Sequence, residues 1–381
     1  MPQLPISDEY FNRCAAVVAD TSNYSKRVRY RVFARQPGVL CGMNRSVAFI
    51  DQQCVGPLRI RARRDGDRYA ANEVVLVIEG MFGELVNLET TYLGMLAFSG
   101  AATKMREIVE AARGVPVTDM AARHYPFEII EQTAYAAAVG GAAGTSTRAG
   151  YRYVHKWLGI GHGDLIRVGD EEPRPYKLYG SIPHALNAVY DGSSVKAAAA
   201  YHERLPDVPL TVLVDFEGRE LDVCREAFER FGPELYAVRL DTSASRVHQG
   251  GHEKPVKELV DRILAEAEDR EAARAALDRF GFGKGVTIEE VYNVRRTLDE
   301  VGARHTRIAV SSGFDAAKVA AFRACHAPID SIGTGTWVGF TVFTSDISHV
   351  WEGGRWVFRC KAGRGEEVVE PPDLPVRIDR Q

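Results

Sequence analysis

Residues 307–336 read RIAVSSGFDAAKVAAFRACHAPIDSIGTGT, and this stretch decides the fold. An apolar run at 307–313 ends in serine and glycine, and a second run at 330–336 ends in GTGT. The residues between the two runs are numerous enough to form a helix. A strand, a helix and a second strand in this order are the repeating unit of a parallel sheet.

Three earlier segments show the same short apolar run that ends in polar residues. They are PVTDM (116–120), LTVLVDF (210–216) and LYAVRLD (235–241). Strands that alternate with helices predict a parallel α/β barrel, which carries its chemistry on loops at the C-terminal strand ends. The charged segment 253–280 is predicted to be a solvent-facing amphipathic helix or helix pair.

The first 84 residues have a different character. Residues 27–80 are predicted to be β-rich, with strands at 27–42, 46–50 (SVAFI) and 73–80 (EVVLVIEG). From residue 85 to Gly114 the apolar spacing becomes helical. We therefore predict an N-terminal α/β domain at 1–84, a barrel at 85–345, and a tail at 346–381 that packs back on the N-terminal domain.

The composition is that of an ordinary globular protein. Among 381 residues 45% are hydrophobic and 26% charged, and the formal net charge is −3. This balance gives no reason to expect nucleic acid or a membrane as partner, and no signal peptide is visible. The six cysteines form no CxxC pair, which favours free thiols in the cytoplasm. Zinc binding by Cys41, Cys54 and Cys360 is left open.

Two glycine-containing loops are candidate phosphate sites. SSGFD (311–315) and GTGT (333–336) each end a predicted strand and are each expected to open a helix, so that backbone N–H groups and the helix dipole would hold a phosphate. GGAAGTST (140–147) lacks the Walker lysine and the GxGxxG pattern. It is predicted to serve close helix packing.

Charged and histidine side chains give further candidates. Arg239 and Asp241 lie two residues apart at the end of one strand, so their side chains point to the same side. Burying either charge is costly unless the two form an ion pair or bind a ligand. His184 falls at a predicted strand-to-helix turn, but spacing alone does not single it out. HQGGHE (248–253) could bind a metal, although we interpret it as a mobile loop.

Taken in order, these segments resemble the nicotinate phosphoribosyltransferase family, particularly its shorter archaeal-type members. The matching motifs run from residue 7 to about residue 346. They are SDEYFNR (7–13), LETTYLGMLAFSGAATKMREIVEAA (88–112), AARHYP (121–126), AYAAAVGGAAGTS (134–146), YGSIPHAL (179–186), LVDF (213–216), VRLDTSASR (238–246), AVSSGFD (309–315) and DSIGTGT (330–336).

The resemblance implies a type II phosphoribosyltransferase. Its fold would be an irregular parallel α/β barrel beside an N-terminal α/β domain, and two subunits would pack head to tail as a homodimer with shared active sites. The reaction would join a pyridine carboxylate, nicotinate, to 5-phosphoribosyl-1-pyrophosphate (PRPP). Mg²⁺ would be required, pyrophosphate would be released, and ATP hydrolysis is coupled to the reaction in many members.

The resemblance also implies roles for individual residues. Asp241 would bind the ribose hydroxyls and balance positive charge at C1, and His184 matches the histidine that ATP-coupled members phosphorylate. Arg239 and Arg123 would approach the base and the phosphates, and Tyr10 would come from the partner. Thr145 and Ser146 would line the base pocket. The 5′-phosphate would be held by Ser311, Ser312, Gly313, Gly333, Thr334, Gly335 and Thr336.

The sequence departs from the family pattern at two motifs. Met120 stands where the family has the aromatic wall of the base pocket, and Ser312 replaces the first glycine of S-G-G. The first change leaves the identity of the base open. Quinolinate and nicotinamide are alternatives to nicotinate, and a catalytically silent nucleotide-binding relative is the alternative from another class.

Overall fold

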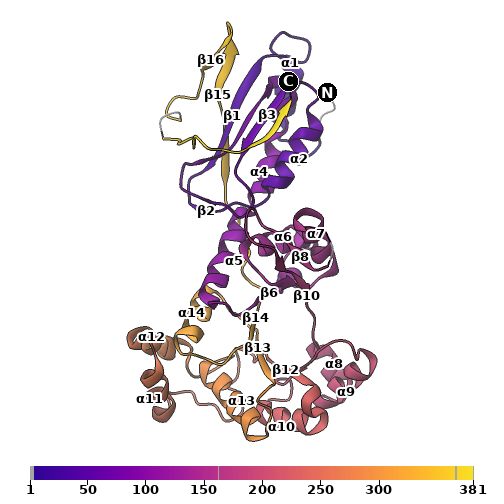
Figure 1. The fold of residues 1–381 in the computed structure, drawn as a ribbon, viewed down its shortest axis with the longest axis vertical. Helices are drawn as coiled ribbons and strands as arrows, with labels where there is room; N and C mark the ends of the chain where they lie inside the picture. Colours follow the sequence, from indigo (N-terminus) through magenta and orange to yellow (C-terminus); the bar gives the residue numbers. More distant parts are fainter. Residues whose placement is uncertain (1–3, 162, 365–366, 381) are drawn as a thin grey trace.

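A computed structural model describes residues 4–161, 163–364 and 367–380. Two parts follow one another along the long axis of the molecule (Figure 1). An antiparallel sheet with its helices forms one end, and a parallel sheet surrounded by helices forms the other. In the described ranges no helix has the length and apolar character needed to cross a membrane.

The antiparallel sheet is built from both ends of the chain. Its six strands lie in the order β16-β15-β1-β5-β3-β17. The tail strand β17 pairs with β3, placing Arg380 opposite Leu58, and β15 pairs with β1. The prediction of a β-rich N-terminal domain completed by the C-terminal tail is confirmed. The strands are β1 (Arg27–Ala34), β3 (Leu58–Ala62), β5 (Val74–Met81), β15 (Phe343–Glu352), β16 (Arg355–Phe358) and β17 (Val376–Arg380).

Helices cover one face of this sheet, and one of them corrects a sequence prediction. SVAFI (46–50) was predicted as a strand but lies inside α2 (Met43–Gln53). The buried residues of α2 recur at helical spacing, which a five-residue window could not reveal. The carboxylate of Asp65 also accepts hydrogen bonds from the backbone N–H groups of Met43 (2.8 Å) and Asn44 (3.0 Å). These bonds satisfy donors that an isolated helix start leaves unpaired.

The second sheet contains all five predicted barrel strands. Its order is β10-β7-β6-β14-β13-β12-β11, and every neighbouring pair is parallel. Within the described residues β10 and β11 form the two edges, so the barrel is incompletely closed, as expected of an irregular one. The strands are β6 (Val117–Asp119), β7 (Gly144–Thr145), β10 (Lys177–Leu178), β11 (Leu210–Leu213), β12 (Leu235–Leu240), β13 (Arg307–Val310) and β14 (Ser331–Thr334).

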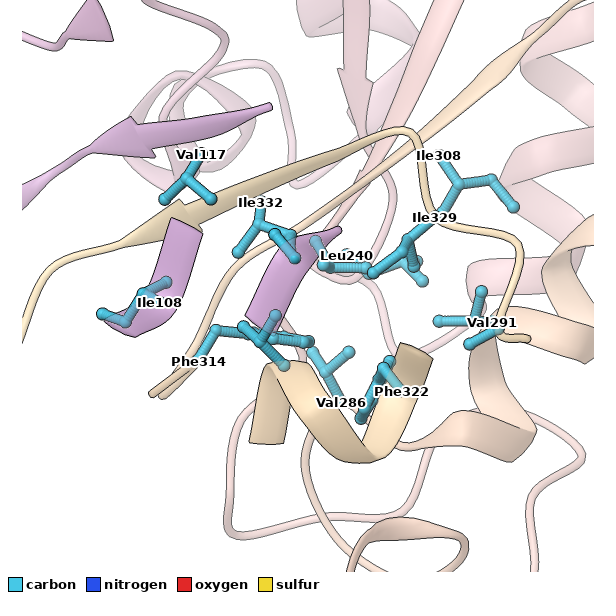
Figure 2. Packing of buried hydrophobic residues seen from close by; sticks show 14 of the residues in the cluster. Ile108, Val117, Leu240, Val286, Val291, Ile308, Phe314, Phe322, Ile329 and Ile332 are labelled. Carbon is cyan, nitrogen blue, oxygen red and sulfur yellow. The ribbon is translucent and has the colours of Figure 1, made fainter. Parts of the chain in front are cut away.

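Buried aliphatic side chains join the parallel sheet to its helices. Figure 2 shows Leu240, Ile308 and Ile332 of the strands beside Phe314 and Phe322, and all five are buried. The predicted charged helix pair exists as α11 (Lys257–Glu266) and α12 (Arg270–Phe280). Other helices of this half are α5 (Ser99–Ala112), α6 (Ile130–Gly140), α10 (Glu220–Phe231), α13 (Ile288–Glu300) and α14 (Ala316–Ala324).

Close packing of two of these helices explains part of the glycine-rich segment 140–147. A Cβ at Gly140 would lie 2.6 Å from the Cβ of Met105 and 2.7 Å from the carbonyl oxygen of Ala102, both in α5. Glycine is therefore needed where α6 crosses α5. The predicted packing role of this segment is confirmed at Gly140.

Candidate functional site at the carboxyl ends of the parallel strands

Polar side chains gather where the parallel strands end. Asp119 closes β6, Asp215 follows β11, and Asp241 follows β12. Ser311 follows β13, and Thr334 is the last residue of β14. Because carboxyl ends of neighbouring parallel strands meet at one edge, these side chains lie together at one end of the incomplete barrel. We call this end the mouth of the parallel sheet.

Arg239 and Asp241 form the ion pair that their spacing suggested. The Arg239 guanidinium donates to the Ser181 hydroxyl at 2.7 Å and to Asp241 Oδ2 at 3.4 Å. The second distance is long for a charge-assisted hydrogen bond. Burial lowers the pKa of Arg239, and Asp241 and Asp215 oppose that shift. Among the described residues Arg239 Nε has no acceptor, so this guanidinium has capacity left for a ligand.

His184 is joined to a carboxylate that the sequence reasoning did not assign to the site. It begins α8 (His184–Val189), and its Nε2 lies 3.1 Å from Asp215 Oδ2. The Asp215 side chain is 5% exposed, whereas that of His184 is 41% exposed. Burial raises the pKa of Asp215, and His184 partly offsets the rise. Asp215 carried a signal in its sequence, because it follows a buried strand as Asp241 does.

The loop after β13 contains two successive residues with positive φ. Ser312 has φ +76° and Gly313 has φ +73°, so both lie in the left-handed region that favours glycine. Helix α14 then begins behind Asp315, which accepts a hydrogen bond from the N–H of Lys318 at 2.8 Å. The prediction that SSGFD opens a helix is confirmed. The serine at 312 adopts a backbone conformation that glycine would reach without strain.

The loop after β14 is different from the prediction. GTGT was expected to open a helix, but the described chain runs irregularly from residue 337 to 342 and enters β15. It is held against the junction between α4 (Glu89–Leu96) and α5, where the N–H of Thr341 donates to the carbonyl of Ala97 at 2.9 Å. Gly100 permits this approach, since a Cβ there would lie 2.5 Å from the backbone of Phe340. The return to the antiparallel sheet therefore takes the place of a helix.

Within GTGT the four residues differ in exposure. Gly333 and Thr334 are buried, and the Thr334 hydroxyl donates to the Phe314 carbonyl at 2.8 Å. This bond fixes the end of β14 to the loop after β13. Gly335 is partly buried and Thr336 is exposed. Gly335 and Thr336 are therefore the residues of GTGT whose backbone N–H groups lie nearest to solvent.

The residues predicted to contact the base lie at the ends of β6 and β7. Met120 follows β6, and its sulfur packs on Gly333, where a Cβ would lie only 2.5 Å away. Arg123 is exposed and close enough to Arg239 to lower the pKa of Arg239 further. Thr145 is 1% exposed and donates to Asp119 Oδ2 at 3.0 Å, so its hydroxyl is already paired, whereas Ser146 is exposed.

Tyr10 lies far from this mouth within its own chain. It belongs to α1 (Glu9–Val18), beside the antiparallel sheet at the opposite end of the molecule (Figure 1). Its side chain is 62% exposed. A contribution of Tyr10 to an active site therefore requires a second chain.

A buried polar network that sequence did not reveal lies beneath the strand ends. Glu290 of α13 is 0% exposed and accepts a hydrogen bond from the Thr242 hydroxyl at 2.6 Å, next to Asp241. Burial raises the pKa of Glu290 to about 8. Lys318, whose pKa burial lowers to about 8, donates to the Ser312 carbonyl at 3.2 Å. The contact between Thr242 and Glu290 joins segments 48 residues apart, and no local motif marks it.

The cysteine and histidine residues considered as metal ligands do not come together as a metal site in the described structure. The described ranges contain no group of three or more histidine, cysteine or acidic side chains placed to hold a metal ion. Cys41 and Cys54 are buried, and burial raises the pKa of Cys54 to about 12. His252 lies 2.7 Å from Glu289 and His248 lies 3.2 Å from Asn293, so the loop at 248–253 is tied to α13.

Known proteins share both the sequence pattern and this architecture. Residues 8–99 match the family described as quinolinate phosphoribosyl transferase, N-terminal domain. Nicotinate phosphoribosyltransferase pncB1 of Mycobacterium tuberculosis is 29% identical over 305 residues, which cover 76% of this chain and 53% of that protein. The chain is thus similar to nicotinate phosphoribosyltransferases in sequence and to nicotinate-nucleotide pyrophosphorylase in fold. It spans about half the length of the curated relatives it matches.

Solved structures agree with the fold. The crystal structure of nicotinate-nucleotide pyrophosphorylase from Pyrococcus furiosus superposes with a TM-score of 0.69 at 26% identity, covering 94% of this chain and 77% of that one. Human nicotinic acid phosphoribosyltransferase gives a TM-score of 0.59 at 14% identity, covering 93% and 76%. At 14% identity, the similarity to the human enzyme supports the fold alone.

Proposed function

We propose that this chain transfers the phosphoribosyl group of PRPP to nicotinate, forming nicotinate mononucleotide and pyrophosphate for NAD synthesis. The observation that carries the proposal is the mouth of the parallel sheet. Asp241, Arg239 and the His184–Asp215 pair lie there with the left-handed loop at Ser312 and Gly313, in a chain similar to nicotinate phosphoribosyltransferase pncB1.

The loop at 311–313 would hold the 5′-phosphate of PRPP. The loop precedes the start of α14, whose helix dipole would favour an anion there. Gly335 and Thr336 would offer further donors from the end of the neighbouring strand β14. Lys318 supports the loop by its hydrogen bond to the Ser312 carbonyl.

Asp241 would act on the ribose. Cleavage of the bond between C1 and pyrophosphate develops positive charge on the sugar, so a fixed carboxylate nearby lowers the barrier. Arg239 holds Asp241 from one side and is itself held by Ser181. The protein then contributes mainly position and charge, with the base nitrogen placed near C1.

The carboxylates of the mouth fit a magnesium ion bound together with PRPP. Mg²⁺ in such sites takes one or two carboxylates and completes its shell with substrate phosphates and water. Asp241 is part-exposed, and Asp215 has one buried oxygen, Oδ1, without a hydrogen bond in the described structure. Bound there, Mg²⁺ would neutralise charge on the leaving pyrophosphate.

ATP coupling would act through His184. Asp215 accepts the hydrogen bond of Nε2, which leaves the lone pair of Nδ1 as the nucleophile for a phosphoryl group. The partial exposure of His184 gives ATP access to the ring. Asp215 is a positioning residue in this proposal, because it acts through the imidazole.

Arg123 would select a base that carries a carboxylate. Arg123 is exposed in this structure, so the bound base itself would have to shield the contact. A shielded charge-assisted hydrogen bond contributes about 1.5–3 kcal/mol, which would favour nicotinate over nicotinamide roughly 10–100-fold. Quinolinate is the second candidate substrate, because the N-terminal domain matches the quinolinate family and Arg239 offers a second guanidinium close to Arg123.

The working unit would be a cytoplasmic homodimer with shared active sites. Tyr10 is exposed on α1 and remote from its own mouth, which suits donation to a partner copy.

The test is release of pyrophosphate from PRPP with nicotinate, quinolinate or nicotinamide, each with and without ATP and Mg²⁺. Preference for nicotinate supports the proposal, and preference for quinolinate selects the second candidate. A folded chain that releases no pyrophosphate with any base would be a silent relative.

A further inference from the structure

A cavity lies outside the strand-end site, between the two parts of the molecule. Its volume is about 240 Å³, far above the ~15 Å³ that one water molecule requires. One wall comes from the N-terminal domain, through Asn44, Arg64 and the tail residue Arg377. The other comes from the end of α7 (Arg148–Leu158) and the segment after it, through Trp157 and Arg167. None of these residues belongs to the strand-end site.

Three guanidinium groups from three separate segments line this cavity. Arg377 is fixed by hydrogen bonds to Asn44 Oδ1 at 2.8 Å and to the Arg63 carbonyl at 3.3 Å, with no carboxylate partner among the described residues. Arg167 is exposed and likewise has no ion pair in the described part of the chain. Arg64 contacts Asp170, whose side chain is 84% exposed, and such exposed pairs contribute little. The lining therefore carries an excess of positive charge.

The one carboxylate in the lining is already occupied. Asp65 is 1% exposed and accepts hydrogen bonds from the N–H groups of Met43 and Asn44 and from the Tyr135 hydroxyl at 2.6 Å. Burial raises the pKa of Asp65, while Arg377 lowers it. Against three guanidiniums this single carboxylate leaves a net charge that suits an anion.

An aromatic ring completes the wall. Trp157 lines the cavity, and in the described structure its buried indole Nε1 has no hydrogen-bond acceptor. Guanidiniums bind phosphate oxygens in pairs, and an indole offers a flat face for a planar ring. Trp157 therefore adds recognition of a planar ring to the anion binding of the arginines.

We propose that this cavity is a nucleotide site, distinct from the catalytic mouth, in which the phosphate lies on Arg64, Arg167 and Arg377 and the base on Trp157. The same chemistry is offered by a mononucleotide and by a dinucleotide. Because the cavity is walled by both parts of the molecule, its occupant would also stabilise their packing.

The test is calorimetric titration of the full chain with AMP, NAD and inorganic phosphate. Both nucleotides should bind one per chain, and Arg167→Gln should weaken both about 10–100-fold, as expected for loss of a charged hydrogen bond. The matched control is Arg152→Gln, an exposed arginine of α7 outside the cavity, which should change the affinity less than about 2-fold. Trp157→Leu should weaken AMP and NAD about 5-fold or more while leaving inorganic phosphate unchanged.

Comparison of AMP with NAD shows whether the ligand is a mononucleotide or a dinucleotide. Equal affinity for AMP and NAD indicates that one phosphate and one base suffice, and tighter NAD binding indicates the dinucleotide. Absence of binding at millimolar concentration, or equal loss in Arg167→Gln and Arg152→Gln, overturns the proposal. The measurement needs no turnover, so its outcome is independent of whether the catalytic proposal holds.

Discussion

Replacing Asp215 by asparagine separates the proposed role of the His184–Asp215 pair from its contribution to the fold. The carboxylate lies 3.1 Å from His184 Nε2 and is 5% exposed, so water cannot replace it. A buried hydrogen bond to a charged group contributes about 1.5–3 kcal/mol. Asparagine keeps the shape but removes the negative charge that would hold the imidazole in place for phosphorylation. We expect ATP-dependent turnover to fall roughly 10–100-fold.

The fold should not be weakened by the same change. Burial raises the pKa of Asp215 above its usual value, so the folded chain binds this proton more tightly than the unfolded chain. Stability is therefore lost as pH rises from the unfolded pKa, near 3.9, through the raised folded value. At pH 7.5 the ionised carboxylate opposes folding, and Asp215→Asn should leave the melting temperature unchanged or higher.

The assay compares pyrophosphate release with and without ATP, together with acid-labile label from radioactive ATP. Asp191→Asn provides a matched control, because that carboxylate is 80% exposed and pairs with Lys196. The reasoning fails if Asp215→Asn retains full labelling and ATP stimulation. It also fails if the variant melts well below the wild-type chain.

Three further changes test other parts of the structure. Asp241→Asn should lower kcat by roughly 10²-fold with an unchanged melting temperature, measured by steady-state kinetics; near-normal kcat would remove Asp241 from the mechanism. The free energy of unfolding of the wild-type chain in urea should fall between about pH 5 and pH 8. Folded Glu290, with a pKa of about 8, keeps a proton that the unfolded chain releases near pH 4.3. Glu290→Gln should flatten this pH dependence. Above pH 8 the lowered pKa of Lys318 should act in the opposite direction. If active sites are shared, inactive Tyr10→Ala and Asp241→Asn chains mixed equally should recover about a quarter of wild-type activity, and no recovery would indicate independent sites.

Five of the parallel strands were predictable because each is a short, mainly apolar run that ends in polar residues. The two-residue strands β7 and β10 carry no such pattern. The polar C-terminal residues of the five strands predict that Arg239, Asp241 and the loop at 311–313 lie at one edge of the sheet. SVAFI was misread because five residues are too few to separate the two periodicities. The missing helix after GTGT depends on the approach of residue 340 to Gly100, which is tertiary.

The pairings of the site were less predictable than its residues. His184 meets Asp215 across 31 positions of sequence, and Thr242 meets Glu290 across 48. Each pairing depends on which strand and helix become neighbours. The charge-rich cavity lined by Arg64, Arg167 and Arg377 was invisible for the same reason, since its lining comes from three distant segments.

The antiparallel sheet has a consequence for how the chain folds as it is made. Arg380 bonds to the carbonyl of Gly56, 324 residues earlier, and β15 shields the edge of β1. During synthesis at ~5–20 residues per second, β1 and β3 therefore wait roughly 15–60 s with open edges while the barrel strands emerge. Open edges invite pairing with other chains. The barrel can complete its sheet first, and the earliest strands are the last to find all their neighbours. Loss of the tail would then expose the beginning of the chain to aggregation and leave the barrel strands paired.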